Sequence, residues 1–259
     1  IKGSGQLEYL TSNSVSDNIL FFPDSTNLHT KQFNLLAVRE GIEFPEANNT
    51  STYVHFEPYK DVMNIYKKQN EFSFYDGVAT FDGDVELRST GLTGGGIMKL
   101  EKAEVSSNHF KYNAVFFNAD TADLVVNADN IGGIAFQSKN LRTYIDLEDK
   151  IGRFYSNGAE SYVQLPENRY TCYIDELKWD MRQQFLELGD TSETAKGTQF
   201  VSSHPLQDSL SFFAKTAHYS LKDYVIHAGG VAKIEVADAT IFPDSGKVVM
   251  EKNANMRTL

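Results

Sequence analysis

Apolar residues recur at every second position along much of the chain, which is the pattern of half-buried β-strands. In residues 108–117, one side of an extended backbone carries Phe110, Tyr112, Ala114 and Phe116. Comparable short segments, rich in Val, Ile, Phe and Tyr and bounded by Gly, Asn, Asp and Ser, occupy residues 78–87, 143–147, 151–155, 209–214 and 231–241. We expect each of these segments to be a strand.

Helical patterns are scarce. Residues 58–68 predict a short amphipathic turn, because Val62, Ile65 and Tyr66 share one side of a helix. Residues 175–188 (DELKWDMRQQFLEL) fit either a strand face or a helical stripe. The surrounding strand-like segments favour the strand.

Similar segments recur about every 20 to 25 residues, a period that is typical of stacked structural units. Three of them, at residues 117–126, 213–219 and 234–241, combine small Ala residues with bulky apolar ones, and turn signals such as Ser156-Asn-Gly158 separate the segments. Each unit would bury its inward side chains by packing on the next. We therefore predict an all-β fold, either an elongated β-solenoid or an open, rolled antiparallel sheet, with a β-sandwich as the alternative.

Domain boundaries are faint. Residues 1–70 are less regular and predict an N-terminal cap, while residues 71–259 predict the β-repeat stack, with a polar loop near 189–198. The chain opens on Ile1 without a Met, so we expect a segment of a longer polypeptide or a mature form without its leader.

Composition narrows the function classes. Of 259 residues, 24 are Lys or Arg and 35 are Asp or Glu, a net charge of −11, and basic runs with interleaved aromatics are absent. A nucleic-acid partner is therefore not expected. Cys172 is the single cysteine and reads as a small buried apolar residue. No apolar run reaches the ~18 residues of a membrane-spanning helix.

Two local clusters have simple structural interpretations. Residues 91–96 (GLTGGG) lack the ending of a phosphate-binding loop and predict a tight turn between strands. The four carboxylates of Asp76, Asp82, Asp84 and Glu86 suggest calcium, but their spacing fits no EF-hand loop. In a strand, the last three share one solvated face. The six histidines are scattered without a zinc-binding pattern, so we expect neither a metal nor another cofactor.

One group of carboxylates and aromatic rings is a candidate glycan site, and its members are Tyr173, Asp175, Trp179 and Asp180. Glycosidase carboxylates lie about 5 to 9.5 Å apart. In a strand, Glu176 and Asp180 would be roughly 13 Å apart, which is too far for catalysis within this segment. These residues are therefore weak candidates for glycan binding, and we predict no catalytic residues.

The sequence of apolar and glycine-containing segments between Ala214 and Val249 resembles the OstA-like repeats of periplasmic lipopolysaccharide-transport proteins, and the likeness extends over residues 78–250. Residues 165–170 and 178–181 are similar to segments of large envelope repeat proteins of the Bacteroidetes type. The resemblance implies stacked β-jelly-roll rungs and a periplasmic scaffold or lipid-conduit role. This chain is more aromatic and more acidic than the transport family.

From these observations we expect a non-catalytic β-repeat scaffold or binding segment of a larger cell-envelope protein. It would offer an apolar trough to lipid-like ligands and contact other segments of its own chain or other envelope proteins. The resemblance places it in the periplasm or at the outer membrane of a Gram-negative bacterium. The alternatives are a glycan-binding or glycan-cleaving β-helix and a β-sandwich adhesion module.

Overall fold

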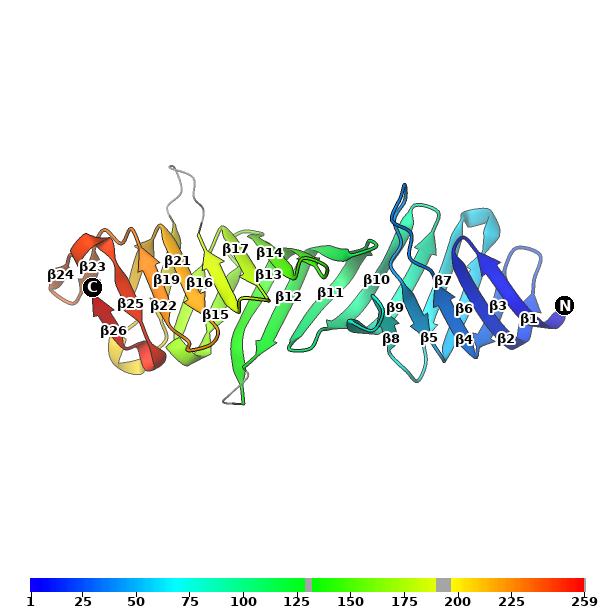
Figure 1. The fold of residues 1–259 in the computed structure, drawn as a ribbon, viewed down its shortest axis with the longest axis horizontal. Helices are drawn as coiled ribbons and strands as arrows, with labels where there is room; N and C mark the ends of the chain where they lie inside the picture. Colours follow the sequence, from blue (N-terminus) through cyan, green and yellow to red (C-terminus); the bar gives the residue numbers. More distant parts are fainter. Residues whose placement is uncertain (129–131, 190–196, 259) are drawn as a thin grey trace. The chain divides into compact units, whose positions relative to one another are not determined.

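The computed structural model describes residues 1–128, 132–189 and 197–258, and it is an all-β protein (Figure 1). Within these residues, the strand pairings are antiparallel, and 24 strands belong to one hydrogen-bonded sheet. The strands are β1 (Lys2–Tyr9), β2 (Ser12–Phe21), β3 (Thr26–Thr30), β4 (Gln32–Leu35), β5 (Ala47–Asn49), β6 (Thr52–Glu57), β7 (Val62–Lys67), β8 (Phe72–Phe74), β9 (Ala79–Arg88), β10 (Gly91–Lys99), β11 (Ala103–Tyr112), β12 (Phe116–Asn127), β13 (Ile134–Asp146), β14 (Ile151–Ser156), β15 (Tyr162–Leu165), β16 (Tyr170–Tyr173), β17 (Glu176–Asp180), β18 (Phe185–Leu188), β19 (Thr198–Ser202), β20 (Ser211–Ala214), β21 (Thr216–Ser220), β22 (Ile226–Gly229), β23 (Ile234–Val236), β24 (Ala239–Ile241), β25 (Val248–Met250) and β26 (Met256–Thr258). Short 3-10 helices occupy Pro58–Lys60 (η1), Pro166–Asn168 (η2), Pro205–Gln207 (η3), Asp244–Gly246 (η4) and Lys252–Ala254 (η5).

The chain divides into two compact units. Unit 1 contains Ile1–Asp120 and Asp146–Glu148, and unit 2 contains Thr121–Ile145 and Asp149–Leu259. The division falls within β12 and β13, whereas the sequence placed a boundary at residue 70. The segment before that boundary is regular, because it contains β1 to β7. Several of these strands are only three to five residues long, too short for a clear alternating pattern. The predicted loop near 189–198 lies mainly outside the described residues.

Two ambiguous segments are strands. Residues 175–188 contain β17 and β18, so the strand interpretation is confirmed. Residues 58–68 contain only one turn of 3-10 helix, and the amphipathic turn predicted there is wrong beyond it. Asp61 adopts a left-handed conformation (φ 53°) that ends the turn. The chain then enters β7, which pairs with β6 and β9.

In unit 1, the strands form two layers that share their long strands. The first half of β2 pairs with β4 and the second half with β3. From there, layer A continues through β3, β6 and β7, and layer B continues through β4, β5 and β8. Both layers meet at β9, which pairs with β8 near Phe81 and with β7 near Val85, and β9 then pairs with β10 on its other side. One pass of the chain across both layers is therefore one rung of the unit.

Unit 2 follows the same order of connections. Layer C contains β14, β17, β18, β21, β22, β25 and β26, and layer D contains β15, β16, β19 and β20. In both units the chain places two consecutive strands in one layer and the next two in the other. The chain crosses the layers once along β9 and returns along β10, so one crossing and its return extend from the start of β9 at Ala79 to the start of β11 at Ala103. The architecture is repeat-like, as the period in the sequence indicated.

Glycines lie where strands cross from one layer to the other. Gly83 stands in β9 between the residues that pair with β8 and those that pair with β7. Its neighbours on β10 are Gly94, Gly95 and Gly96, where the register with β11 shifts by a bulge. The tight turn predicted at residues 91–96 is therefore wrong: these glycines lie inside a strand. A Cβ on any of these three would lie within 2.6 Å of a backbone oxygen.

Aromatic side chains fill the space between the layers of unit 1. The ring of Phe81 is fully buried and lies 5.7 to 6.5 Å from the rings of Phe72, Phe74, Phe110 and Tyr112. In unit 2, Phe200 and Phe212 stack at 5.4 Å, and Tyr170 packs edge-on against both. Buried aromatic rings contribute the largest apolar area per residue, so these clusters stabilise the rungs.

Candidate functional site

The four predicted glycan-site residues do not form one surface. Trp179 is 6% exposed, and its ring packs edge-on against Phe136 with centroids 5.7 Å apart. Asp180 is also buried, and its carboxylate accepts a hydrogen bond from the backbone N–H of Gln183 at 2.8 Å. Tyr173 and Asp175, which flank the buried Ile174 in the chain, are both exposed. Trp179 and Asp180 therefore serve the core and a turn, and the ring of Trp179 is not available to a sugar.

The acidic strand residues lie on the outer face of β9, as predicted. Asp82 forms an ion pair with Lys67, and that hydrogen bond lowers the pKa of the Asp82 carboxyl. The carboxylate of Asp84 accepts the backbone N–H of Lys67 at 2.8 Å, and Glu86 pairs with Arg88 at 2.6 Å. Asp82 and Asp84 therefore link β9 to the end of β7, whereas the Glu86–Arg88 pair lies within β9. In the described part of the chain, no group of three or more His, Cys, Asp or Glu side chains is placed to hold a metal ion.

A hydrogen-bonded cluster joins strand ends in unit 1. Tyr9 donates to the Asp61 carboxylate, which also accepts the Ser89 hydroxyl at 2.5 Å. These bonds, with that of Ser89 first, lower the pKa of Asp61. Burial, and then the bond to Asp61, raise the pKa of Tyr9 to about 12. At neutral pH both groups stay in one protonation state, so the cluster is suited to holding the rungs together rather than to proton transfer.

Cys172 is fully buried on β16, as the sequence indicated. Burial raises the pKa of its thiol, because the thiolate would lose its hydration. A nucleophilic cysteine needs the thiolate near neutral pH. Cys172 is therefore a packing residue.

Strand β1 has one edge that no described strand covers. β1 is eight residues long and pairs only with β2 in the described residues. The carbonyls of Thr11 and Val15 accept hydrogen bonds from N–H groups on the β4 side of β2. In an antiparallel strand every second residue points its N–H and C=O to the same side, so those of Asn13 also point toward β4 and away from β1. Glu8 lies opposite Asn13, and its N–H and C=O therefore point away from β2. Long uncovered edges of this kind are templates for a further strand.

Exposed apolar side chains accompany this edge. Ile1 exchanges two backbone hydrogen bonds with Phe21, at 3.0 and 2.8 Å. Ile1, Leu20, Phe21 and Phe22 are 97%, 38%, 42% and 50% exposed. A sheet edge flanked by exposed apolar residues is typical of a contact surface.

A depression of about 330 Å³ lies on the outer face of layer C. Its lining is Thr216, His227, Ala228, Gly229, Lys247, Val248 and Val249, from β21, β22 and the start of β25. Gly229 pairs with Thr216 and contributes no side chain to the lining. The residues that line the depression include a lysine, a histidine and a hydroxyl, and none of them is acidic.

Lys247 is presented to the depression by a short, hydrogen-bonded turn. Its backbone N–H bonds to the carbonyl of Asp244 at 3.1 Å, and the carbonyl of Gly246 accepts the N–H of Val231 at 2.9 Å. The Lys247 side chain is exposed, and the described residues place no carboxylate within ion-pair distance of it. Hydrogen bonds therefore hold the backbone at Lys247 in place, and no carboxylate of the described residues forms an ion pair with its ammonium group.

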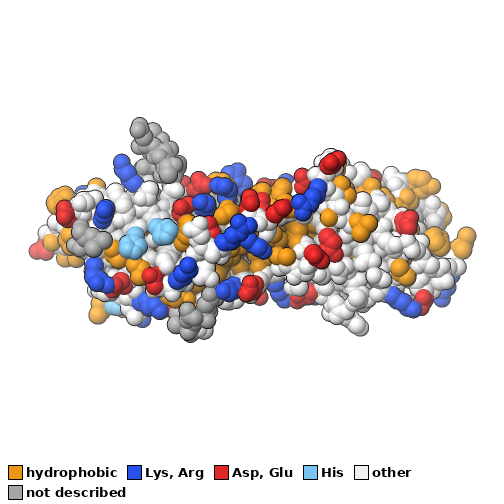
Figure 2. Space-filling view, in the orientation of Figure 1, with side chains coloured by type: hydrophobic (Ala, Val, Ile, Leu, Met, Phe, Trp, Pro, Cys, Tyr) orange, Lys and Arg blue, Asp and Glu red, His pale blue; other side chains and the backbone are white. Residues whose placement is uncertain are grey.

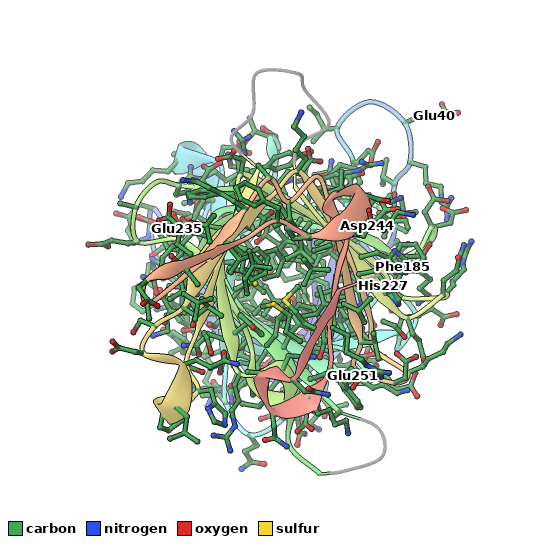
Figure 3. All side chains as sticks on the ribbon, turned by 90° about the vertical axis from the view of Figure 1, so that its left-hand side faces the viewer. Glu40, Phe185, His227, Glu235, Asp244 and Glu251 are labelled. Carbon is green, nitrogen blue, oxygen red and sulfur yellow. The ribbon has the colours of Figure 1, made fainter. Side chains whose placement is uncertain are left out.

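A row of rings leads to the depression along the same face. His218 and His227 are direct partners across β21 and β22, and both are exposed. The ring of Phe185 on β18 lies 4.5 Å from that of His218, centroid to centroid. Histidine side chains are visible side by side on the surface in Figure 2, and Figure 3 places Phe185 and His227 on the same side of the ribbon.

The sequence analysis did not single out this row. The outward direction of His218 and His227 is readable from the alternation in residues 216–220 and 226–229. Their partnership follows from the hairpin that joins β21 to β22. The position of Phe185 beside them depends on β18 pairing with β21, and the two strands are separated in the chain by β19 and β20.

Comparisons with protein-family models, with curated proteins and with solved structures return no match. Among the helices of the described residues, none has the length and apolar character to cross a membrane.

Proposed function

We propose that this chain is a non-catalytic β-repeat scaffold, a segment of a larger cell-envelope protein. The observation that carries the proposal is that the two units connect their strands in the same order. Side chains fill the interior of the rungs in both units. Repeats of this kind gain stability from neighbouring rungs and provide long surfaces. We further propose that the rungs continue through β12 and β13, so that the chain is one elongated β-solenoid.

Small-angle X-ray scattering tests the shape that this proposal requires. A compact protein of 259 residues has a radius of gyration of about 18 Å. A continuous stack of rungs gives a clearly larger value and a distance distribution with a long tail. A radius of gyration close to that of a compact protein, measured in dilute solution, would contradict the solenoid and favour a sandwich.

The uncovered edge of β1 supports a contact role at the start of the stack. The partner in this proposal is another strand, from the same longer chain, from a second copy or from another envelope protein. Proline at position 8 would remove only the N–H that points away from β2, which edge strands tolerate. Glu8→Thr is the matched control, because it removes the same carboxylate and keeps the N–H.

Sedimentation velocity over a range of concentrations gives the readout for pairing with a second copy. We expect the wild type and Glu8→Thr to associate and Glu8→Pro to remain monomeric. Equal association of Glu8→Pro would show that the β1 edge is not the contact.

The location in the periplasm or at the outer membrane of a Gram-negative bacterium is supported by the resemblance to OstA-like repeats. An apolar trough for a lipid-like ligand has less support, because aromatic rings occupy the space between layers A and B. Glycan cleavage has less support for another reason. Glu176 and Asp180 lie at the two ends of strand β17, which is extended.

A further inference from the structure

The outer face of layer C combines two features that recognise different parts of one ligand. Its row of rings, from Phe185 through His218 to His227, lies on three neighbouring strands. The depression overlaps the end of this row on β21 and β22 and extends to β25, with Lys247 just before that strand. Strands are spaced about 4.8 Å apart, so the row and the depression together span roughly 14 Å. An extended ligand of several repeating units matches this length better than a single ion does.

The rings suit the apolar faces of sugars. The face of an aromatic ring carries partial negative charge and attracts positively polarised C–H groups. His218 and His227 are exposed, and Phe185 is half-buried. The rings of Phe185 and His218 cover one face of each other, with centroids 4.5 Å apart and planes 34° apart, which leaves their solvent-facing sides and the His227 ring for a sugar. The edges of the two histidine rings also offer N–H groups for hydroxyls.

The depression suits an anionic group. Lys247, His227 and the Thr216 hydroxyl are its polar side chains. The carboxylate of Glu187, which lies opposite His218 in register, is paired with Lys178 at 3.0 Å. Lys247 is therefore the one residue with a formal charge among those that line the depression, although the chain as a whole carries −11.

Other polyanions fit this face less well. A peptide that binds a sheet by strand addition needs an edge, and β21 and β22 are paired on both sides. A nucleic acid needs several Lys or Arg side chains along its phosphates. The depression contains one lysine.

We propose that the outer face of layer C binds an acidic polysaccharide. Sugar rings pack against the solvent-facing side of the row formed by Phe185, His218 and His227, and a carboxylate or sulfate group of the same chain occupies the depression, where Lys247 and Thr216 donate hydrogen bonds to it. This role is independent of the scaffold proposal, because it requires only layer C to be folded.

Isothermal titration calorimetry with five probes tests the proposal on the full chain. The probes are tetragalacturonate, a sulfated chondroitin tetrasaccharide, cellotetraose, sodium sulfate and tetraglutamate. We expect one or both charged tetrasaccharides to bind at least about tenfold more tightly than the other three, and more weakly at high salt. The preferred tetrasaccharide identifies the group as carboxylate or sulfate. Tetraglutamate or sulfate binding as tightly as the charged sugars would overturn the proposal.

Two substitutions separate the contributions of charge and rings. Lys247→Gln should weaken charged tetrasaccharides about tenfold and leave cellotetraose unchanged, because only the ion contact is lost. His218→Ala should weaken charged and neutral sugars alike. Lys233→Gln and His109→Ala are the matched controls, since both residues are exposed and lie outside this face. Unchanged binding in Lys247→Gln, with a native circular dichroism spectrum, would overturn the proposal.

Discussion

Gly83 of β9 and Gly95 of β10 lie against each other where unit 1 bends from layer B to layer A. A Cβ on Gly83 would be 2.3 Å from the carbonyl oxygen of Gly95. Such a contact is far shorter than any that real side chains show. The missing side chains allow two adjacent long strands to bend together, so the layers can enclose the aromatic cluster around Phe81.

Gly83→Ala should therefore destabilise unit 1. The added methyl group meets backbone, which moves only with the strand, and overpacking of this kind costs about 1–3 kcal/mol. Chemical denaturation of the purified variant measures the loss. Gly3→Ala is the matched control, since its nearest neighbour is a side-chain atom of Phe21 at 3.3 Å. Equal stability of Gly83→Ala and wild type would show that the bend has room for a side chain.

Trp179 should behave as a core residue. Trp179→Ala leaves a cavity beside Phe136 and should cost about 3–5 kcal/mol of unfolding free energy. The native fluorescence of this single Trp should be blue-shifted and protected from iodide. Tyr173→Ala removes a neighbouring exposed ring and should change stability little. Loss of glycan binding in a stable Trp179→Ala variant would restore the site that the sequence suggested.

Stability should fall between pH 10 and pH 12, in part because of Tyr9. Its pKa is raised from 10.0 to about 12 in the folded protein, so the unfolded chain releases this proton first. The contribution is fully present below pH 10 and is lost as the pH rises through the folded value. Tyr9→Phe should therefore lose less stability than the wild type over this range in denaturation curves. Tyr59→Phe is the control, because Tyr59 is 84% exposed, and an identical pH dependence of Tyr9→Phe and wild type would contradict the shift.

Cys172 should resist thiol reagents while the protein is folded. Burial raises the pKa of the thiol, and the side chain is inaccessible. We expect Ellman's reagent to label it only after denaturant is added, in step with unfolding followed by circular dichroism. Rapid labelling of the native protein at neutral pH would instead indicate a reactive thiol.

Local alternation was enough to predict the fold class and many inward positions. Phe110 and Tyr112 of β11 are both buried, as the pattern indicated. The same pattern failed a few residues later: Phe117, not Phe116, is the buried member, because the chain turns at residues 113–115 and starts a new strand. A two-residue period carries no information about where an extended segment turns.

The candidate sites depended on contacts that the sequence does not show. Trp179 reads as a surface aromatic beside acids, but the strand on which it lies turns it toward Phe136. The three glycines at 94–96 read as a turn, and only the backbone of β9 next to them shows that they allow a bend.

The sequence by itself determined that this protein is built from short antiparallel strands with an apolar and a polar side, because alternation acts between neighbours in the chain. Tertiary structure alone decided which strands lie together. The pairing of β18 with β21 brings Phe185 to His218, and the pairing of β22 with β25 places Lys247 and His227 around one depression. Pairings between such distant segments depend on how all the rungs pack together, and that packing is a property of the whole fold.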